Sequence, residues 1–323
     1  MVNSSPIQRA ASLLGALALA MLATQAAAAS YVYKQPAPGL VASAVPAAPA
    51  APSGESASCT LPWGGTLASG ATTTAYAAEK VAAPGTCVSE TLSCTNGALS
   101  DPTAAQSCVV TDPSWGNVSA LLEFDGSLSD ARGTTVTPTG VAKLSSSVFK
   151  VGTGSLDLST GGYVSEPAGA LNFGTGDFTV EFWYKRVTDN GSYQHLILNN
   201  APDGSLFQVV YGNSGFGSQL MVYAGAAASP LLVSGVTKTS SGTAWHHYAV
   251  TRSAGTLNVY FDGARVAQRV GATANLTSAN AWIVGSSSGY NPYGYFDGLR
   301  VTKGYARYTG TTMTPADAPF PRD

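Results

Sequence analysis

Apolar and polar side chains alternate along residues 244–266, AWHHYAVTRSAGTLNVYFDGARV. In an extended chain His246, Tyr248 and Val250 fall on one face, and the residues between them fall on the other. A second alternating stretch follows a short turn and ends at Asp262-Gly263, a dipeptide that supplies the positive φ of hairpin turns. The segment therefore predicts two half-buried antiparallel strands.

Similar strand patterns recur over the last two thirds of the chain. Turn-forming residues separate them at intervals of roughly ten residues, which is typical of an all-β sandwich, and no useful helical period occurs. We therefore predict one all-β domain of two antiparallel sheets over residues 113–323. The expected strands are Ala120–Phe124, Ser155–Leu158, Phe178–Lys185, Gln194–Leu198, Leu206–Tyr211, Gln219–Tyr223, Trp245–Arg252, Leu257–Phe261, Ala281–Val284 and Tyr295–Thr302.

The amino-terminal segment has the pattern of an export signal. Arg9 precedes an apolar run over residues 10–23, and small residues then lead to Ser30. A Sec-type signal peptide over residues 1–29 explains this pattern, and it places the mature chain outside the cell or on its surface, with no membrane insertion after cleavage. The alternative is an uncleaved membrane anchor, for which the run is short.

Residues 30–56 are rich in Pro and Ala and lack the apolar pattern of a core, so we expect a semi-rigid linker. All four cysteines follow it, at Cys59, Cys87, Cys94 and Cys108, and they define a small cystine module over residues 57–112. An even cysteine set behind an export signal predicts two disulfides, and three pairings are open. A zinc site is the alternative, but its cysteines usually lie closer together in sequence.

The charge content excludes one class of partner. Charged residues make up 11% of the chain, and the formal net charge is −2. An average soluble domain has about 25% charged residues. No Lys or Arg run is present, so we expect no nucleic acid binding.

Several segments carry a likeness to a known family. They are LLEFDGSLSDARG (121–133), GTGSLDLSTGGYV (152–164), FGTGDFTVEFWYKR (173–186), WHHYAVTRSAGTLNVYFDGARV (245–266) and YFDGLRVTKGYARYTGTTMTPADAPFP (295–321). These segments resemble the concanavalin A-like lectin/glucanase superfamily, in its laminin G-like branch. This resemblance implies a jelly-roll sandwich, and the superfold serves lectins, adhesins, hydrolases and spacers alike. The last segment also resembles tail-fibre and other virion-associated proteins of phages.

Retaining glucanases of this superfold carry an E-x-D-x-x-E motif, whose paired carboxyl groups lie about 5 Å apart. The best match here is Asp177 with Glu181, at the wrong spacing and without a third carboxylate. Glu181 and Trp183 nevertheless share one face of the strand, where a carboxylate beside an indole ring suits sugar binding. The alternative is a sheet face that loops cover.

Aromatic side chains in Gly-, Ser- and Asn-rich loops are the other candidates for ligand contact. Tyr290, Tyr293 and Tyr295 lie in SSSGYNPYGYFDG, and Tyr193 lies in a similar loop, as do Tyr211 and Phe216. This composition is typical of adaptable recognition surfaces. The alternative is that these rings only close one end of the sandwich.

No cofactor is required by any motif, and calcium is the one candidate ion. The resemblance to jelly-roll lectins implies a rim site, for which Asp125 and Asp189 are our candidate ligands because calcium prefers oxygen. The alternative is that these aspartates form turns. Adjacent His246 and His247 point to opposite strand faces, so they cannot chelate one ion together.

The sequence therefore favours a secreted or surface-displayed binding protein, not an enzyme, that recognises a carbohydrate or a cell-surface partner through rim loops. Binding would be weak per site unless display is multivalent. Two alternatives stay open: a phage or prophage virion or surface structural protein without a ligand, and a glycoside hydrolase. The oligomeric state stays open as well.

Overall fold

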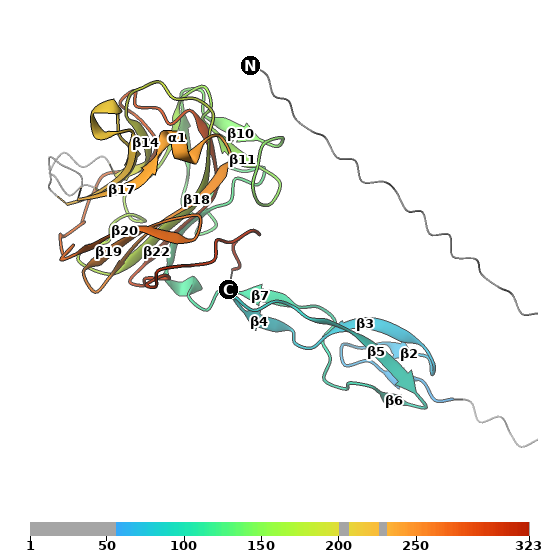
Figure 1. Cartoon of the computed structure of the whole chain (residues 1–323). Helices are drawn as coiled ribbons and strands as arrows, with labels where there is room; N and C mark the ends of the chain where they lie inside the picture. Colours follow the sequence, from blue (N-terminus) through green and yellow to red (C-terminus); the bar gives the residue numbers. More distant parts are fainter. Residues whose placement is uncertain (1–55, 200–206, 226–230, 323) are drawn as a thin grey trace, which may run out of the picture. The chain divides into compact units, whose positions relative to one another are not determined.

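The computed structural model describes residues 56–199, 207–225 and 231–322 (Figure 1). By internal contacts the chain divides into Met1–Gly54 and Glu55–Asp323. The predicted signal peptide and nearly all of the predicted linker therefore lie outside the described residues. Within the described ranges, no helix is long and apolar enough to span a bilayer.

Residues 56–112 form a module of short strands joined by two disulfides. Cys59 pairs with Cys94 and Cys87 with Cys108, which settles the pairing that the sequence left open. The strands are β1 (Cys59–Thr60) with β2 (Thr66–Leu67), β3 (Thr72–Tyr76) with β5 (Ser89–Thr95) and β6 (Ala98–Leu99), and β4 (Lys80–Ala82) parallel to β7 (Val109–Thr111).

The apolar core of this module is small. It consists of Ala75, Leu92 and Ala104, with Trp63 packed against it. Few apolar contacts are therefore available to offset the conformational entropy of folding, and crosslinks become the main stabilising element.

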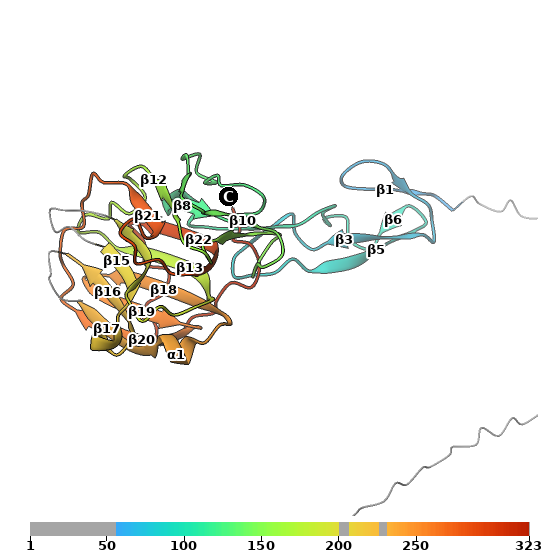
Figure 2. The ribbon, with the colours of Figure 1, turned by 90° about the horizontal axis from the view of Figure 1, so that it is seen from above.

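The described residues after the module form two stacked antiparallel sheets, which confirms the predicted sandwich (Figures 1 and 2). One sheet has eight strands in the order β10-β11-β22-β13-β18-β19-β20, and β8 also pairs with β22. Its strands are β8 (Val118–Leu122), β10 (Lys143–Ser145), β11 (Ser155–Asp157), β13 (Phe178–Arg186), β18 (Trp245–Ser253), β19 (Thr256–Phe261), β20 (Ala264–Val270) and β22 (Gly294–Lys303).

The second sheet has seven strands in the order β17-β16-β15-β14-β21-β12-β9. These are β9 (Thr137–Thr139), β12 (Tyr163–Glu166), β14 (Gln194–Asn199), β15 (Phe207–Tyr211), β16 (Gln219–Ala224), β17 (Leu232–Thr237) and β21 (Trp282–Gly285). The single α-helix of the described residues, α1 (Lys238–Ser241), is one turn long and follows β17 (Figure 1).

All ten expected strands are present, with ends shifted by at most two residues, and Leu206 lies outside the described residues. The first expected strand was to end at Phe124, but β8 ends at Leu122. Phe124 has a φ of 59°, a left-handed conformation that a strand does not continue. The strands that sequence patterns missed are short or lie at edges, such as β9, whose three residues are all exposed.

The side chains of β13 on the face opposite Glu181 and Trp183 point into the core. Phe178, Val180, Phe182 and Tyr184 are fully buried in the core between the sheets. The ring of Phe182 stacks on that of Tyr248 from β18, with centroids 5.2 Å apart. Burial of these aromatic side chains removes apolar area from water and helps to hold the two sheets together.

The polar face of the eight-stranded sheet differs from the prediction of half-buried strands. Residues 304–320 cover it, so that Thr251 and Tyr260 are as buried as the core residues. Their hydroxyls donate to backbone carbonyls of this segment, Thr251 to Tyr308 at 2.9 Å and Tyr260 to Gly310 at 2.8 Å. A buried polar face is tolerated because such bonds satisfy it.

We expect reduction to unfold the cystine module before the sandwich. Each disulfide stabilises a module of this size by about 3 kcal/mol. The sandwich contains no disulfide, because no cysteine follows Cys108. Limited proteolysis of the full chain with and without reductant should show new cleavage within residues 57–112, and the Cys87→Ser/Cys108→Ser variant should show part of it without reductant. Simultaneous loss of both parts would contradict this expectation.

Candidate functional site

Four loops meet at one end of the sandwich. They are residues 187–193 between β13 and β14, 212–218 between β15 and β16, 238–244 between β17 and β18, and 286–293 between β21 and β22. The antiparallel registers bring them together, because Gln194 lies opposite Tyr211, and Gln219 lies opposite Thr237. The backbone N–H of His195 also donates to the Tyr290 carbonyl at 2.9 Å.

Aromatic side chains from three of these loops, together with His195 at the start of β14, form one cluster. We call this cluster the aromatic rim, and its members are Tyr193, His195, Phe216 and Tyr290. The Tyr193 ring lies 5.7 Å from that of Tyr290 and 6.0 Å from that of Phe216, and His195 lies 5.0 Å from Tyr290. Phe216 is 41% exposed and Tyr290 39% exposed. Large apolar rings at this exposure are available to a ligand.

Local turn chemistry sets the position of Phe216. The Asn213 side chain accepts a hydrogen bond from Gly215 at the start of a short 3-10 helix, and Gly217 ends the helix with a φ of 62°. A Cβ atom at Gly212 would lie 2.8 Å from the Phe216 Cβ and 3.0 Å from a Met221 side-chain carbon. Glycine at this position therefore lets the loop pack closely on the outer face of the sheet.

A buried ion pair holds the loop that carries Tyr193. Lys238 is fully buried, and its ammonium lies 3.0 Å from Asp189 Oδ1 and also donates to the Ser192 carbonyl. The pKa of Asp189 is lowered: burial acts to raise it, but the Gly191 N–H and Lys238 outweigh burial. No sequence pattern singles out Lys238, because a lone lysine usually lies on the surface.

The structure separates the six predicted ligand-contact residues into two groups. Tyr193 and Tyr290 meet in the aromatic rim, and the Tyr293 carbonyl accepts a hydrogen bond from Val187, which ties two rim loops together. Tyr211, which the sequence analysis named in addition to these six, is fully buried, and its hydroxyl forms a hydrogen bond with that of Tyr248. The other group, Glu181, Trp183 and Tyr295, lies on the outer face of the eight-stranded sheet.

Glu181 and Trp183 do not offer a surface to a ligand. Glu181 is fully buried, and the Trp183 indole donates to the Ala316 carbonyl at 2.9 Å beneath the carboxy-terminal segment. The carboxy-terminal segment covers this sheet face, which corresponds to the alternative interpretation of a covered face. We therefore leave these two residues out of the candidate site.

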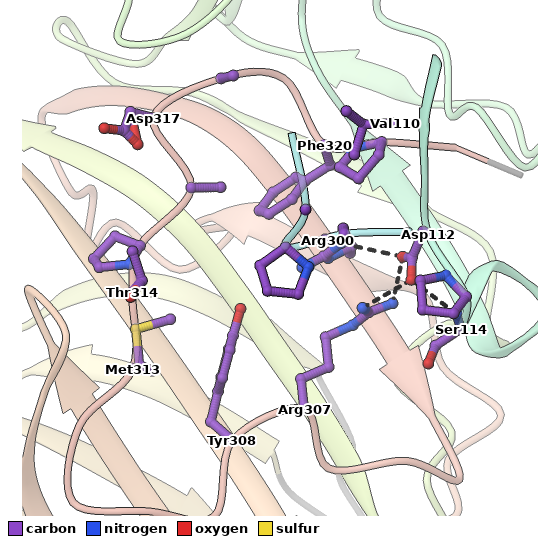
Figure 3. A pocket seen from close by; sticks show the side chains of 18 of the residues that line it. Val110, Asp112, Ser114, Arg300, Arg307, Tyr308, Met313, Thr314, Asp317 and Phe320 are labelled. Atoms are coloured by element: carbon purple, nitrogen blue, oxygen red, sulfur yellow. Dashed lines mark hydrogen bonds and ion pairs between the residues drawn. The ribbon is translucent and has the colours of Figure 1, made fainter. Parts of the chain in front are cut away.

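Glu181 belongs to a buried ion network. Arg300 donates to Glu181 Oε1 at 2.8 Å and to Asp112 at 3.2 Å, and Arg307 forms a two-point contact with the same Asp112 carboxylate (Figure 3). The Tyr308 hydroxyl donates to Glu181 Oε2 at 2.8 Å. Burial would raise the pKa of Glu181, but Arg300, His247 and Arg307 outweigh burial and hold it at about 2.

A groove of about 980 Å³ lies beside this network, between the carboxy-terminal segment and residues 83–86. Figure 3 shows Arg300 and Arg307 converging on Asp112 in its wall. Both guanidinium groups are already paired with carboxylates. Neither of them is therefore free to bind an anionic ligand in the groove.

The Asp177–Glu181 pair lacks the geometry of a glycosidase site. Asp177 Oδ1 accepts the Ala254 N–H at 2.9 Å, whereas Glu181 is ionised and inaccessible. A retaining mechanism needs one carboxyl that donates a proton and one that reaches the sugar. Glu181 is fully buried and cannot reach a sugar, so the pair does not supply both groups.

The two candidate calcium ligands have different partners. Asp125 Oδ1 accepts backbone N–H bonds from Thr153 and Gly154 at 2.5 and 2.9 Å. At Asp189 the Lys238 ammonium occupies the place that a cation would take. Within the described ranges, no group of three or more His, Cys, Asp or Glu residues is arranged to hold a metal ion.

Residues 158–305 match a family model described as the concanavalin A-like lectin/glucanases superfamily. Domain 4 of AbnA, a GH43 extracellular arabinanase from Geobacillus stearothermophilus solved with arabinotriose, is 18% identical, with 59% of this chain and 94% of that chain covered and a TM-score of 0.47. No curated protein sequence matches.

Two further solved structures are similar at lower coverage. Botulinum neurotoxin type C, whose cell entry depends on two ganglioside molecules, is 12% identical, with 58% of this chain and 48% of that chain covered and a TM-score of 0.44. A Trypanosoma rangeli sialidase mutant with trans-sialidase activity is 13% identical, with 58% and 31% covered and a TM-score of 0.41. The chain thus spans about half of the toxin chain in that structure and about a third of the sialidase chain.

We expect Asp189→Ala to destabilise the protein by about 1–3 kcal/mol, because it leaves a buried ammonium without its charged partner. Replacing both residues, as in Lys238→Met/Asp189→Ala, should restore part of the loss. Urea denaturation measures both effects, with Asp317→Ala at an exposed aspartate as the control. Equal stability of the Asp189 and Asp317 variants would refute the role of the pair.

We expect Glu166→Gln to flatten the pH dependence of stability. Burial, then the Asp130 charge, raises the pKa of Glu166 from 4.5 to about 8. A raised pKa in the folded state stabilises the protein below pH 4.5, and this contribution is lost as the pH rises through 8. The loss reaches a few kcal/mol, at about 1.4 kcal/mol per pKa unit.

Melting temperatures of the wild type and of Glu166→Gln between pH 4.5 and 9 test this expectation. Burial raises the pKa of Asp297 to about 7 as well, and this residue stays in both proteins as an internal reference. Parallel curves for the two proteins would show that Glu166 is not responsible.

Proposed function

Because residues 158–305 belong to the concanavalin A-like lectin/glucanase superfamily, we propose that this chain is a binding protein whose aromatic rim recognises a carbohydrate. The fold alone does not select this function, since related sandwiches serve many purposes. The observation that carries the proposal is the clustering of Tyr193, Phe216 and Tyr290 from three separate loops at one exposed end of the sandwich.

Rings in this arrangement suit a sugar. The apolar C–H face of a pyranose stacks on an aromatic ring, and the two exposed rings, Phe216 and Tyr290, flank the half-buried Tyr193. The loops around them add short polar side chains, including exposed Ser287 and Ser288, that can exchange hydrogen bonds with hydroxyl groups. Few polar groups around an apolar surface are typical of a ligand site.

The loops are held firmly enough to present these rings. The Ser286 hydroxyl accepts hydrogen bonds from the backbone of Ser288 and Tyr290 at 3.2 and 3.1 Å. The Tyr293 carbonyl and the Lys238–Asp189 pair fix the neighbouring loop. A site that is already ordered loses less entropy when it binds its ligand.

Two other observations support a binding role outside the cell. The disulfides Cys59–Cys94 and Cys87–Cys108 suit an oxidising compartment. The carboxylate of Glu181 is sealed beneath the carboxy-terminal segment, which favours binding over glycoside hydrolysis at that sheet face. A shallow rim gives weak binding per site, so display of several copies would raise the avidity.

We expect Tyr290→Ala to weaken glycan binding about tenfold, since a lost stacking contact of about 1 kcal/mol or more corresponds to this factor. A glycan array followed by calorimetry on the retained glycan measures the change. Tyr305→Ala is the matched control, because Tyr305 is 45% exposed but lies beside the groove instead of the rim.

Equal loss of binding in both tyrosine variants would show that the rim is not the site. Absence of any retained glycan in the wild-type protein would contradict the proposed function itself and would favour the structural-protein alternative.

A further inference from the structure

The four rim loops contain only two charged side chains. Loops 212–218 and 286–293 carry none, loop 187–193 carries Asp189, and loop 238–244 carries Lys238. All other positions in these loops are Gly, Ser, Thr, Asn, Pro or apolar and aromatic residues. The net charge of the four loops themselves therefore depends on this one pair.

The two charges neutralise each other. The Lys238 side chain is 1% exposed, and its ammonium is enclosed between Asp189 Oδ1 at 3.0 Å and the Ser192 carbonyl. A buried ammonium with a charged partner this close keeps that partner, because separation would leave it desolvated and unpaired. Lys238 is therefore not available to an anionic ligand.

Three other basic side chains near the rim, Arg186, His195 and His246, are hydrogen-bonded or uncharged. Arg186 directs its guanidinium to the carbonyls of Lys238 and Gly242. Burial lowers the pKa of His195 to about 4, so its imidazole is uncharged near neutral pH. At the start of β18, His246 Nδ1 lies 2.6 Å from Asp262 Oδ2.

We propose that the aromatic rim selects uncharged saccharides and rejects glycans that carry sialic acid, uronic acid or sulfate; this inference rests on the proposed function. An acidic glycan that stacks on Tyr290 and Phe216 would lose part of the hydration of its anionic group. No cation of the rim loops compensates this loss, whereas sites for anionic ligands use Arg or Lys pairs. Hydroxyl groups meet no such penalty, because short polar side chains replace water.

A second consequence concerns salt. Binding that involves no ion pair is insensitive to ionic strength, whereas recognition of an anion by a surface cation weakens as salt screens it. We therefore expect the affinity for a neutral glycan to change less than twofold between about 0.05 and 0.5 M NaCl, a range over which screening lengths fall severalfold.

Matched glycans test the proposal with the full chain. Neutral galactose-, glucose-, mannose- and arabinose-based oligosaccharides are compared with the same backbones capped by sialic acid, oxidised to uronic acid or sulfated. We expect neutral members to be retained and their acidic counterparts to bind at least tenfold more weakly, with Tyr290→Ala reducing the neutral signal.

Stronger binding of the acidic members, weakened by salt and lost in Tyr290→Ala, would overturn the neutral preference while leaving the rim as the binding site. Binding of no glycan at all would remove the proposed function and this inference together.

A charge added to the rim gives an independent test that leaves the buried pair intact. Ser287 is exposed within loop 286–293, so Ser287→Arg is expected to fold and to place a cation near Tyr290. We expect at least a tenfold gain in binding of acidic glycans, reversed by salt, and no gain in Ser287→Gln. No gain with Ser287→Arg would show that missing positive charge is not what excludes acidic glycans.

Discussion

The buried ion network around Glu181 and Arg300 is the constraint on which the rest of the structure depends. It lies on the polar face of the central strands β13 and β22, where charged groups need complete pairing once water is removed. Asp112 and Arg307 complete that pairing, and Arg307 belongs to the segment that covers the sheet. The charges therefore fasten the carboxy-terminal segment onto the sandwich, and the segment in turn keeps water away from the charges.

This covering decides where a ligand can bind. A two-sheet sandwich usually has an accessible sheet face as well as its rim loops, but here the face that carries Glu181 and Trp183 is sealed. At the loop end, the exposed rings of Phe216 and Tyr290 both contact the half-buried Tyr193 ring. Under the proposed function, binding takes place at loops that a rigid scaffold presents.

In the rim loops, as in the network around Glu181, a buried charge is paired with a group of opposite charge. Asp189 has the residue type and loop position of a calcium ligand, yet a lysine ammonium from the next loop neutralises it. An internal cation gives the loop a fixed position without an ion from solution. It also leaves the four rim loops without net charge, and our inference about uncharged saccharides rests on this property.

The sequence by itself determined the local structure of this protein: period-2 alternation placed the strands and the inward face of β13, and clustered cysteines predicted the disulfides but not their pairing. Only the tertiary structure decided that Glu181 is buried, that Tyr193 meets Tyr290, and that Lys238 neutralises Asp189. Alternation reports which side chains share a face of a strand, because it arises from backbone geometry between neighbouring residues. Which segment covers that face depends on contacts between residues more than a hundred positions apart, such as Glu181 and Tyr308, and no local pattern encodes them.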